Sequence, residues 1–156
     1  MNDFEPDAVE DGLWVGRAPR TPEDFAFLSD IGVTDVLTLQ TEDEARLCGI
    51  RPSIGFRLAG AHGMALHRIP MRDFSRRELT DRLAEAAVLV KKLRDKRRHV
   101  YVHCAIGINR SPTVVAAYLA LSRGLDAGEA CRVVKTAHLS HPDQEAVREA
   151  LKGLDR

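Results

Sequence analysis

Four short apolar runs alternate with helical patterns along this chain, and this alternation restricts the folds open to it. The runs are rich in Val and Leu and cover residues 13–15, 33–39, 65–69 and 99–103. Each is long enough for a buried strand, and helix start signals or helical spacing occur between them. Strands that alternate with helices form layered sheets in which most neighbours are parallel. We therefore expect a single-domain layered α/β fold, with a central, mostly parallel sheet flanked by helices.

Capping residues predict where the helices begin. Segments with helical character start at four residues of the N-cap type, namely Thr21, Thr41, Ser75 and Asp126. Thr41 and Ser75 each have a glutamate three residues later, the spacing of a capping box. A further helix is expected over residues 110–123, ending at Gly124, and a last one from Pro142.

Two segments lack a clear pattern. Residues 51–63 contain several glycines and little periodicity, so we expect a loop there. Residues 1–12 are polar and acidic, and we expect a flexible lead-in. The remaining residues, 13–156, are expected to form one folded domain.

Length and charge limit the class of protein. The chain has 156 residues, 44% of them hydrophobic, which suits one domain with its own core. Basic and acidic residues number 23 each, so the formal charge is zero, and we expect no nucleic-acid partner. The chain has neither a secretory signal pattern nor a run of 18 apolar residues, so we expect no membrane partner. We also expect a monomer.

The cysteines are too few and too widely spaced for a disulfide framework, since only Cys48, Cys104 and Cys131 are present. Free thiols are typical of a reducing compartment, so we expect a cytoplasmic location. Cys48 and Cys131 are interpreted as ordinary buried cysteines. An alternative for Cys48 is a protective disulfide with an oxidised Cys104.

The third cysteine lies in a loop suited to anion chemistry. Cys104 follows the strand at residues 99–103, and the helix that begins near Arg110 is only six residues further on. A tight loop with Gly107 at its middle can turn its N–H groups inward, and the helix N-terminus also favours an anion. The same groups stabilise a thiolate, the nucleophilic form of cysteine. Arg110 adds a planar fork of donors that can hold two phosphate oxygens.

The loop sequence HCAIGINRS, residues 103–111, resembles the H-C-x5-R-S/T signature of the cysteine-based protein tyrosine phosphatases. The dual-specificity branch is the most similar, because the chain is small and carries the run Ala-Tyr-Leu at residues 117–119. Residues 13–16 and 32–37 resemble the first strands of that branch. The resemblance implies a dual-specificity phosphatase-like fold and hydrolysis of phosphate monoesters, with phosphorylated proteins as substrates. Phosphotyrosine is the main expectation, with phosphoserine and phosphothreonine as further substrates.

The resemblance also implies the roles of particular residues. Cys104 is the nucleophile, and the loop N–H groups bind phosphate together with Arg110, over residues Ala105, Ile106, Gly107, Ile108 and Asn109. Ser111 helps the thiolate leave and His103 supports the loop. The general acid of the family precedes the cysteine by some thirty residues on a loop, which implies Asp73, 31 residues upstream. Asp81 and Asp95 are competitors within an expected helix. No metal or cofactor is implied.

Core packing would be the usual interpretation of a lone cysteine at the end of a strand, but Gly107, Arg110, Ser111 and Asp73 together favour a nucleophile at Cys104. Other functions stay open. The chain could be a catalytically silent phospho-binding module, a rhodanese-like sulfurtransferase, or a phosphatase of glucan, lipid or RNA 5′-phosphates. The loop lacks Lys and Arg between Cys104 and Arg110, which argues against highly phosphorylated lipids.

Charged and titratable residues outside the loop have ordinary interpretations. The arginines beside the acid loop could contact a substrate anion or form a solvated helix start; they are Arg72, Arg76 and Arg77. The histidine pairs are interpreted as surface residues rather than ligands: His62 with His67, and His138 with His141.

Overall fold

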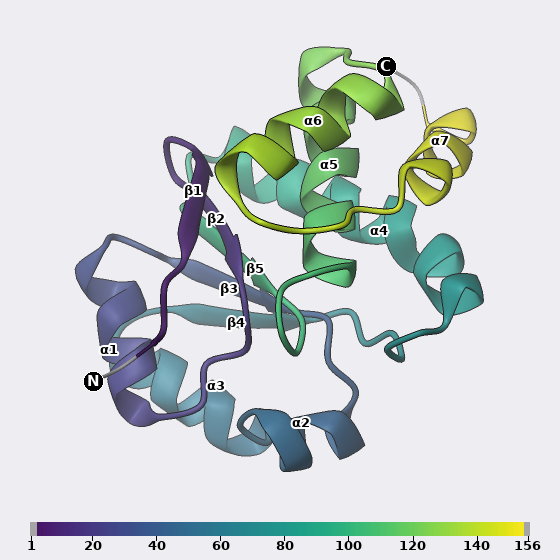
Figure 1. Cartoon of the computed structure of the whole chain (residues 1–156). Coiled ribbons are helices and arrows are strands. Elements are labelled where there is room, and N and C mark those ends of the chain that lie inside the picture. Colours follow the sequence, from purple (N-terminus) through teal and green to yellow (C-terminus); the bar gives the residue numbers. More distant parts are fainter. Residues whose placement is uncertain (1–2, 155–156) are drawn as a thin grey trace.

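A five-stranded sheet runs through the centre of the protein in the computed structural model, which describes residues 3–154 (Figure 1). Its strands are β1 (Asp7–Glu10), β2 (Leu13–Gly16), β3 (Asp35–Thr38), β4 (Ala65–Arg68) and β5 (Val100–His103). They lie in the order β1-β2-β5-β3-β4, and only β1 is antiparallel to its neighbour. The expected mostly parallel sheet is confirmed.

The register of the sheet places β5 between two strands that end at the same level. Gly16 of β2 and Thr38 of β3 both lie opposite His103, the last residue of β5. The loops that follow these strands therefore meet at one edge, which is where α/β folds bind their ligands. Cys104 stands at the centre of that edge.

Helices cover both faces of the sheet (Figure 1). One face carries α4 (Arg76–Asp95), α5 (Arg110–Arg123), α6 (Ala127–Ala137) and α7 (Gln144–Lys152). The other carries α1 (Pro22–Asp30) and α3 (Pro52–Ala61), with α2 (Glu42–Cys48) following β3 on the same side. Two apolar cores result, because successive strand residues point to opposite faces: Val100 and Val102 pack toward α5, and Tyr101 packs toward α1.

The predicted helix starts are confirmed. Four N-cap side chains accept a hydrogen bond from the backbone N–H three residues on: Thr21, Thr41, Ser75 and Asp126. Helix α5 ends at Gly124, which has φ +69°, as expected for a glycine that stops a helix. The last helix is capped by Asp143 rather than begun by Pro142.

Two segments differ from the sequence prediction. Residues 52–61 form helix α3 instead of a loop; Pro52 occupies its first turn, and the small residues Gly55 and Ala59 are buried against the sheet. Small buried residues leave no apolar stripe, so the helical pattern was hidden. Within residues 1–12, expected to be flexible, Asp7–Glu10 pair with β2 as a strand; residues 1–2 lie outside the described part.

In residues 3–154 no helix is both long enough and apolar enough to span a bilayer.

Candidate active site

The loop from Cys104 to Arg110 joins β5 to α5 at the edge described above. Its tight path depends on Gly107, whose φ is +77°. A Cβ atom there would lie 2.6 Å from the carbonyl carbon of Gly16, so the loop lies directly against the end of β2. Glycine is required at this position by both the backbone angle and the close approach.

The carbonyl groups of this loop are tied to partners on its outer side. Four of these hydrogen bonds come from residues outside α5: His103 Nδ1 to Cys104 O (3.0 Å), Ala18 N to Ala105 O (3.0 Å), His138 Nε2 to Gly107 O (2.6 Å) and His141 N to Ile108 O (2.7 Å). A trans peptide holds its C=O and the next N–H in opposite directions. The following N–H groups are therefore directed to the inside of the loop, which is the arrangement of an anion nest.

Cys104 lies at the base of this nest and is 2% exposed. Its Sγ lies 3.2 Å from the hydroxyl of Ser111, in the first turn of α5. That hydroxyl also lies 3.4 Å from the carbonyl oxygen of Gly16. Because the hydroxyl has one hydrogen, it can donate either to the sulfur or to the carbonyl, and so can respond to the charge on Cys104.

Arg110 is held in place by three hydrogen bonds. Its Nη1 donates to Glu44 Oε1 at 2.8 Å and to the carbonyl oxygen of Met71 at 2.9 Å. Its Nη2 donates to Glu44 Oε2 at 2.5 Å. Its Nε is buried without a hydrogen-bond partner, at 3.4 Å from Asp73 Oδ1. Of the five donor hydrogens of the guanidinium, two make no hydrogen bond: the one on Nε and the second one on Nη2. These two hydrogens lie on the same edge of the group and could bind two oxygens of an oxyanion.

Charge on Arg110 is favoured even though the side chain is 2% exposed. Burial alone lowers the pKa, but the Glu44 hydrogen bonds and the nearby Cys104 and Asp73 raise it above its ordinary value. Arg110 is therefore a permanent cation beside the nest.

Glu44 was missed by the sequence analysis. Its backbone N–H completes the cap of α2, and the capping-box spacing assigned its side chain to that cap as well. The carboxylate instead makes a bidentate pair with Arg110, 66 residues away. Two further acids precede Glu44 in the first turn of α2. This acid cluster was the one feature of the sequence that could have indicated a partner for Arg110.

Asp73 lies in the loop that follows β4, as the sequence predicts. Its carboxyl is 29% exposed and accepts a hydrogen bond from the N–H of Phe74 at 3.1 Å. The competitors lie on α4 instead, where Asp81 pairs with Arg77 and Asp95 pairs with Lys91. Of the three aspartates, Asp73 is the one the structure places within ion-pair distance of Arg110.

A small cavity of about 130 Å³ opens between the two loops. Phe74 stands on its rim with 97% of its surface exposed and a positive φ of 61°. The cavity is lined by Arg72, Phe74, Ser75, Arg76, Leu79, Asn109, Arg110 and Asp143.

His103 supports the loop from behind and is fully enclosed. Burial lowers its pKa to about 4, so the ring is neutral near pH 7 and donates from Nδ1 to the Cys104 carbonyl. The ring stacks on Tyr101, whose hydroxyl donates to the carbonyl oxygen of Arg17 at 2.6 Å. A neutral donor tautomer is thus fixed by packing.

The arginines beside the acid loop each pair with an acid. Arg72, Arg76 and Arg77 pair with Glu78, Asp143 and Asp81 respectively, and Arg72 and Arg76 also line the small cavity. All three cysteines are free, and burial raises the pKa of Cys48 and Cys131. Cys131 is buried as expected, but Cys48 is only half-buried because it lies at the C-terminal end of the short helix α2.

His138 does not fit its predicted place on the surface, because its side chain is 12% exposed and contacts the nest. His62 and His141 are exposed, as predicted. In the described part of the chain, no cluster of three or more His, Cys, Asp or Glu side chains could hold a metal ion.

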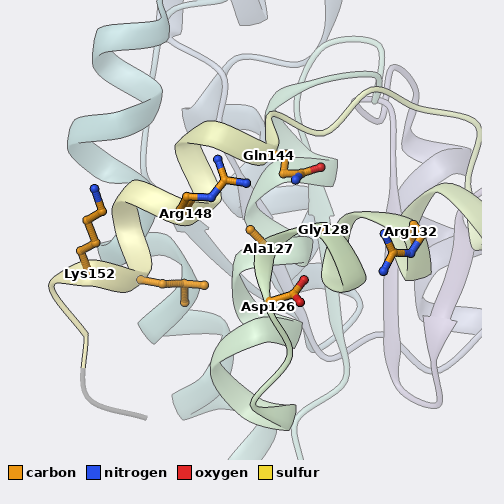
Figure 2. Close-up of a pocket in the computed structure, with 8 residues that line it drawn as sticks. Asp126, Ala127, Gly128, Arg132, Gln144, Arg148 and Lys152 are labelled. Carbon is orange, nitrogen blue, oxygen red and sulfur yellow. The ribbon is translucent and has the colours of Figure 1, made fainter.

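A second, larger pocket of about 620 Å³ lies between α6 and α7 (Figure 2). Arg132, Arg148 and Lys152 give it a basic character, although Arg148 and Lys152 pair with Glu145 and Glu149. None of the predicted site residues line it.

Comparison with known proteins agrees with this geometry. The family described as "Dual specificity phosphatase, catalytic domain" matches residues 13–147. Phosphoglucan phosphatase DSP4 of Castanea sativa is 29% identical over 144 residues, which are 91% of this chain and 38% of that protein. Dual specificity protein phosphatase 12 of Mus musculus is 29% identical over 128 residues, 82% of this chain and 34% of that protein. The chain thus spans less than two fifths of the length of these relatives.

Solved structures show the same fold. PTPMT1 superposes with a TM-score of 0.78 at 22% identity, covering 95% of this chain and 94% of its own. Human DUSP28 superposes with a TM-score of 0.72 at 22% identity, covering 97% and 93%. With the family match over most of the sequence, these results establish that the chain belongs to the dual specificity phosphatase catalytic domain family.

Proposed function

We propose that this protein hydrolyses phosphate monoesters, with phosphotyrosine in proteins as its substrate. The observation that carries the proposal is the edge of Arg110 beside a ring of inward N–H groups, where the buried Nε makes no hydrogen bond and lies 3.4 Å from Asp73 Oδ1. A buried donor without a hydrogen bond is costly, and a phosphate oxyanion can supply that bond. Cys104 Sγ at the base of the ring supplies the nucleophile.

The reaction has two steps. In the first, the thiolate of Cys104 attacks phosphorus, an S–P bond forms, and the bond from phosphorus to the leaving oxygen breaks. Asp73 in its acid form gives its proton to that oxygen. The equatorial phosphate oxygens accept from Arg110 and from the N–H groups of residues 105–110.

In the second step, water attacks the cysteinyl-phosphate while the Asp73 carboxylate accepts its proton. The S–P bond breaks and inorganic phosphate leaves. The Ser111 hydroxyl, 3.2 Å from Sγ, stabilises the departing thiolate. A phosphate bound at the free edge of Arg110 also competes with Asp73 for that guanidinium, which releases the carboxyl toward the leaving group.

The surface around the nest favours an aromatic leaving group over a highly charged one. Ile106 and Ile108 of the loop are 57% and 41% exposed, and Phe74 is 97% exposed. Aromatic rings pack well on such side chains, whereas a multiply phosphorylated headgroup would find no free Lys or Arg in the loop. This supports phosphotyrosine, and phosphoserine and phosphothreonine are expected to react more slowly.

A phosphorylated glucan is the second candidate. The observation behind it is the 29% identity to a phosphoglucan phosphatase over 91% of this chain. An exposed aromatic side chain such as Phe74 can also stack on a sugar ring.

The three free cysteines support action in a reducing, cytoplasmic setting, and we infer that the protein works as a monomer.

The test is release of inorganic phosphate from a panel of phosphotyrosine peptide, phosphoserine peptide, phosphorylated amylopectin and 4-nitrophenyl phosphate. We expect the highest kcat/KM among biological substrates for the phosphotyrosine peptide, and no turnover by the Cys104→Ser variant. Faster release of phosphate from amylopectin would show that phosphorylated glucans, rather than phosphotyrosine proteins, are the substrates. Tight binding of the peptide with no turnover by the unmodified protein would indicate a silent binding module.

A further inference from the structure

A short segment between α6 and α7 closes the outer side of the phosphate loop. Residues 138–141 form this strap, which makes three hydrogen bonds to the loop. His138 Nε2 donates to Gly107 O at 2.6 Å, His141 N donates to Ile108 O at 2.7 Å, and Asn109 Nδ2 donates to His141 O at 3.0 Å. Only the first of these hydrogen bonds uses a side chain of the strap, so it is the one that a substitution in the strap can remove.

The ring of His138 has a partner at each nitrogen. Nδ1 lies 2.6 Å from Asp7 Oδ2 on β1, and Nε2 lies 2.6 Å from Gly107 O. The carbonyl oxygen of Gly107 only accepts hydrogen bonds, so Nε2 donates to it. The contact between Nδ1 and the Asp7 carboxylate holds the ring in the orientation in which Nε2 reaches Gly107 O.

The bond acts on the peptide that follows the one glycine of the loop. The Gly107 carbonyl belongs to the same peptide plane as the N–H of Ile108, and Gly107 has the positive φ that only glycine adopts easily. If that plane rotated, the Gly107 carbonyl oxygen would point into the nest and the Ile108 N–H would point out of it. A donor that is fixed on the outer side of the loop and reaches Gly107 O prevents this rotation.

On this basis we propose that His138 is a positioning residue of the active site, held by Asp7, that keeps the Gly107–Ile108 peptide turned for oxyanion binding. The inference rests on the proposed function in one respect, namely that the nest binds a phosphoryl group. Strand β1 then also contributes to the site, because Asp7 at its start orients the His138 ring.

The test compares two amides at position 138. His138→Gln can place its amide nitrogen near the position of Nε2 and donate to Gly107 O. His138→Asn places its nitrogen near the position of Nδ1, where it can reach Asp7 but not Gly107 O. The two variants are similarly polar, so a merely structural role would affect them alike. His62→Asn, at an exposed histidine after α3, is the matched control.

Two readouts are measured for each variant: the Kd of tungstate, a tetrahedral oxyanion, and kcat/KM for 4-nitrophenyl phosphate. Loss of the hydrogen bond to Gly107 O in His138→Asn is expected to weaken tungstate binding about tenfold and to lower kcat/KM by a similar factor. His138→Gln is expected to recover most of both losses, and His62→Asn to match the unmodified protein. Thermal unfolding confirms that each variant is folded.

The outcomes separate the two proposals. Equal tungstate affinity in the Asn and Gln variants, whether high or low, would overturn the positioning role. If the unmodified protein binds tungstate but turns over no phosphate ester, the proposed function fails. A gap between the Gln and Asn variants in tungstate binding would in that case still support the role of His138.

Discussion

Two loops at the same edge of the sheet contribute to the site, and they are built differently. The phosphate loop, residues 104–110, has its carbonyls tied outward, and Cys104 and Arg110 are each 2% exposed. The acid loop, residues 69–75, carries a half-buried Asp73 and a Phe74 that is 97% exposed. The phosphate loop is fixed from several sides before substrate binds, while the acid loop carries one partly exposed and one fully exposed functional side chain.

The difference assigns separate tasks to the loops. Donors that are already oriented stabilise charge on phosphate without reorganisation, so the phosphate loop should control every substrate alike. A general acid matters in proportion to how poor the leaving group is, so the acid loop should discriminate among substrates. Substitutions in the two loops should therefore differ in how strongly their effects depend on the leaving group.

The largest effect is expected for Cys104→Ser, which removes the thiolate from the buried loop. Turnover should fall by a factor on the order of 10⁴ or more, whatever the leaving group, because a serine hydroxyl there has no comparable nucleophilicity. Steady-state kinetics with aryl and alkyl phosphates measures this. Cys48→Ser is the matched control and should retain activity, and equal losses in the two variants would contradict the assignment.

Asp73→Asn is expected to lower kcat for phosphotyrosine peptide by about 10²- to 10⁴-fold, since the leaving oxygen is no longer protonated. The loss should be much smaller for 4-nitrophenyl phosphate, whose leaving group departs readily as an anion. Asp81→Asn, on α4, should behave like the unmodified protein. A loss of the same size for both substrates would show that Asp73 is not the acid.

Gly107→Ala tests how rigid the phosphate loop is. The positive φ alone should cost about 1–3 kcal/mol of unfolding free energy, and the new Cβ would clash with the backbone of Gly16. Chemical denaturation gives the change in stability, and Gly63→Ala is the matched control because it has a positive φ but nothing within 4 Å of its Cβ. An equal loss in both variants would mean that the close approach to β2 is unimportant.

His103 should make stability depend on pH. Its pKa in the folded state is about 4, below the ordinary value of 6.5, so only the unfolded chain gains a proton between these values. Stability from this residue is complete above pH 6.5 and falls as the pH falls toward 4, by roughly 1.4 kcal/mol per pH unit. Denaturation of the unmodified protein and of His103→Asn across this range should give a shallower slope for the variant; equal slopes would rule out a neutral buried ring.

The smallest effect is expected for Phe74→Ala on the exposed loop. Loss of ring packing should raise KM for phosphotyrosine peptide about two- to tenfold and leave KM for phosphoserine peptide nearly unchanged. Kinetics with the two peptides checks this. An equal rise for both would assign Phe74 to the shape of the acid loop rather than to the substrate.

The parts of the site that are close together in sequence could be predicted. Cys104, Gly107, Arg110 and Ser111 fall within eight residues, and a strand before them and a helix after them fix their relation. Asp73 was expected from the family resemblance and a loop position, and the structure brings it to 3.4 Å from Arg110.

The parts that could not be predicted depend on long-range contacts. Glu44 meets Arg110 from 66 residues away, and its local spacing favoured a helix cap. His138 contacts Gly107 from 31 residues away and Asp7 from 131 residues away. Nothing near His138 in sequence distinguishes it from a surface histidine. Helix α3 was hidden because it packs through Gly55 and Ala59 rather than through a stripe of large residues.

A crystal structure of the protein with bound tungstate tests the central claim most directly. We predict the tungsten atom in line with Cys104 Sγ, with oxygens accepting from the N–H groups of residues 105–110 and from Nε and Nη2 of Arg110. Tungstate bound instead in the basic pocket between α6 and α7, with the phosphate loop closed to it, would contradict the account.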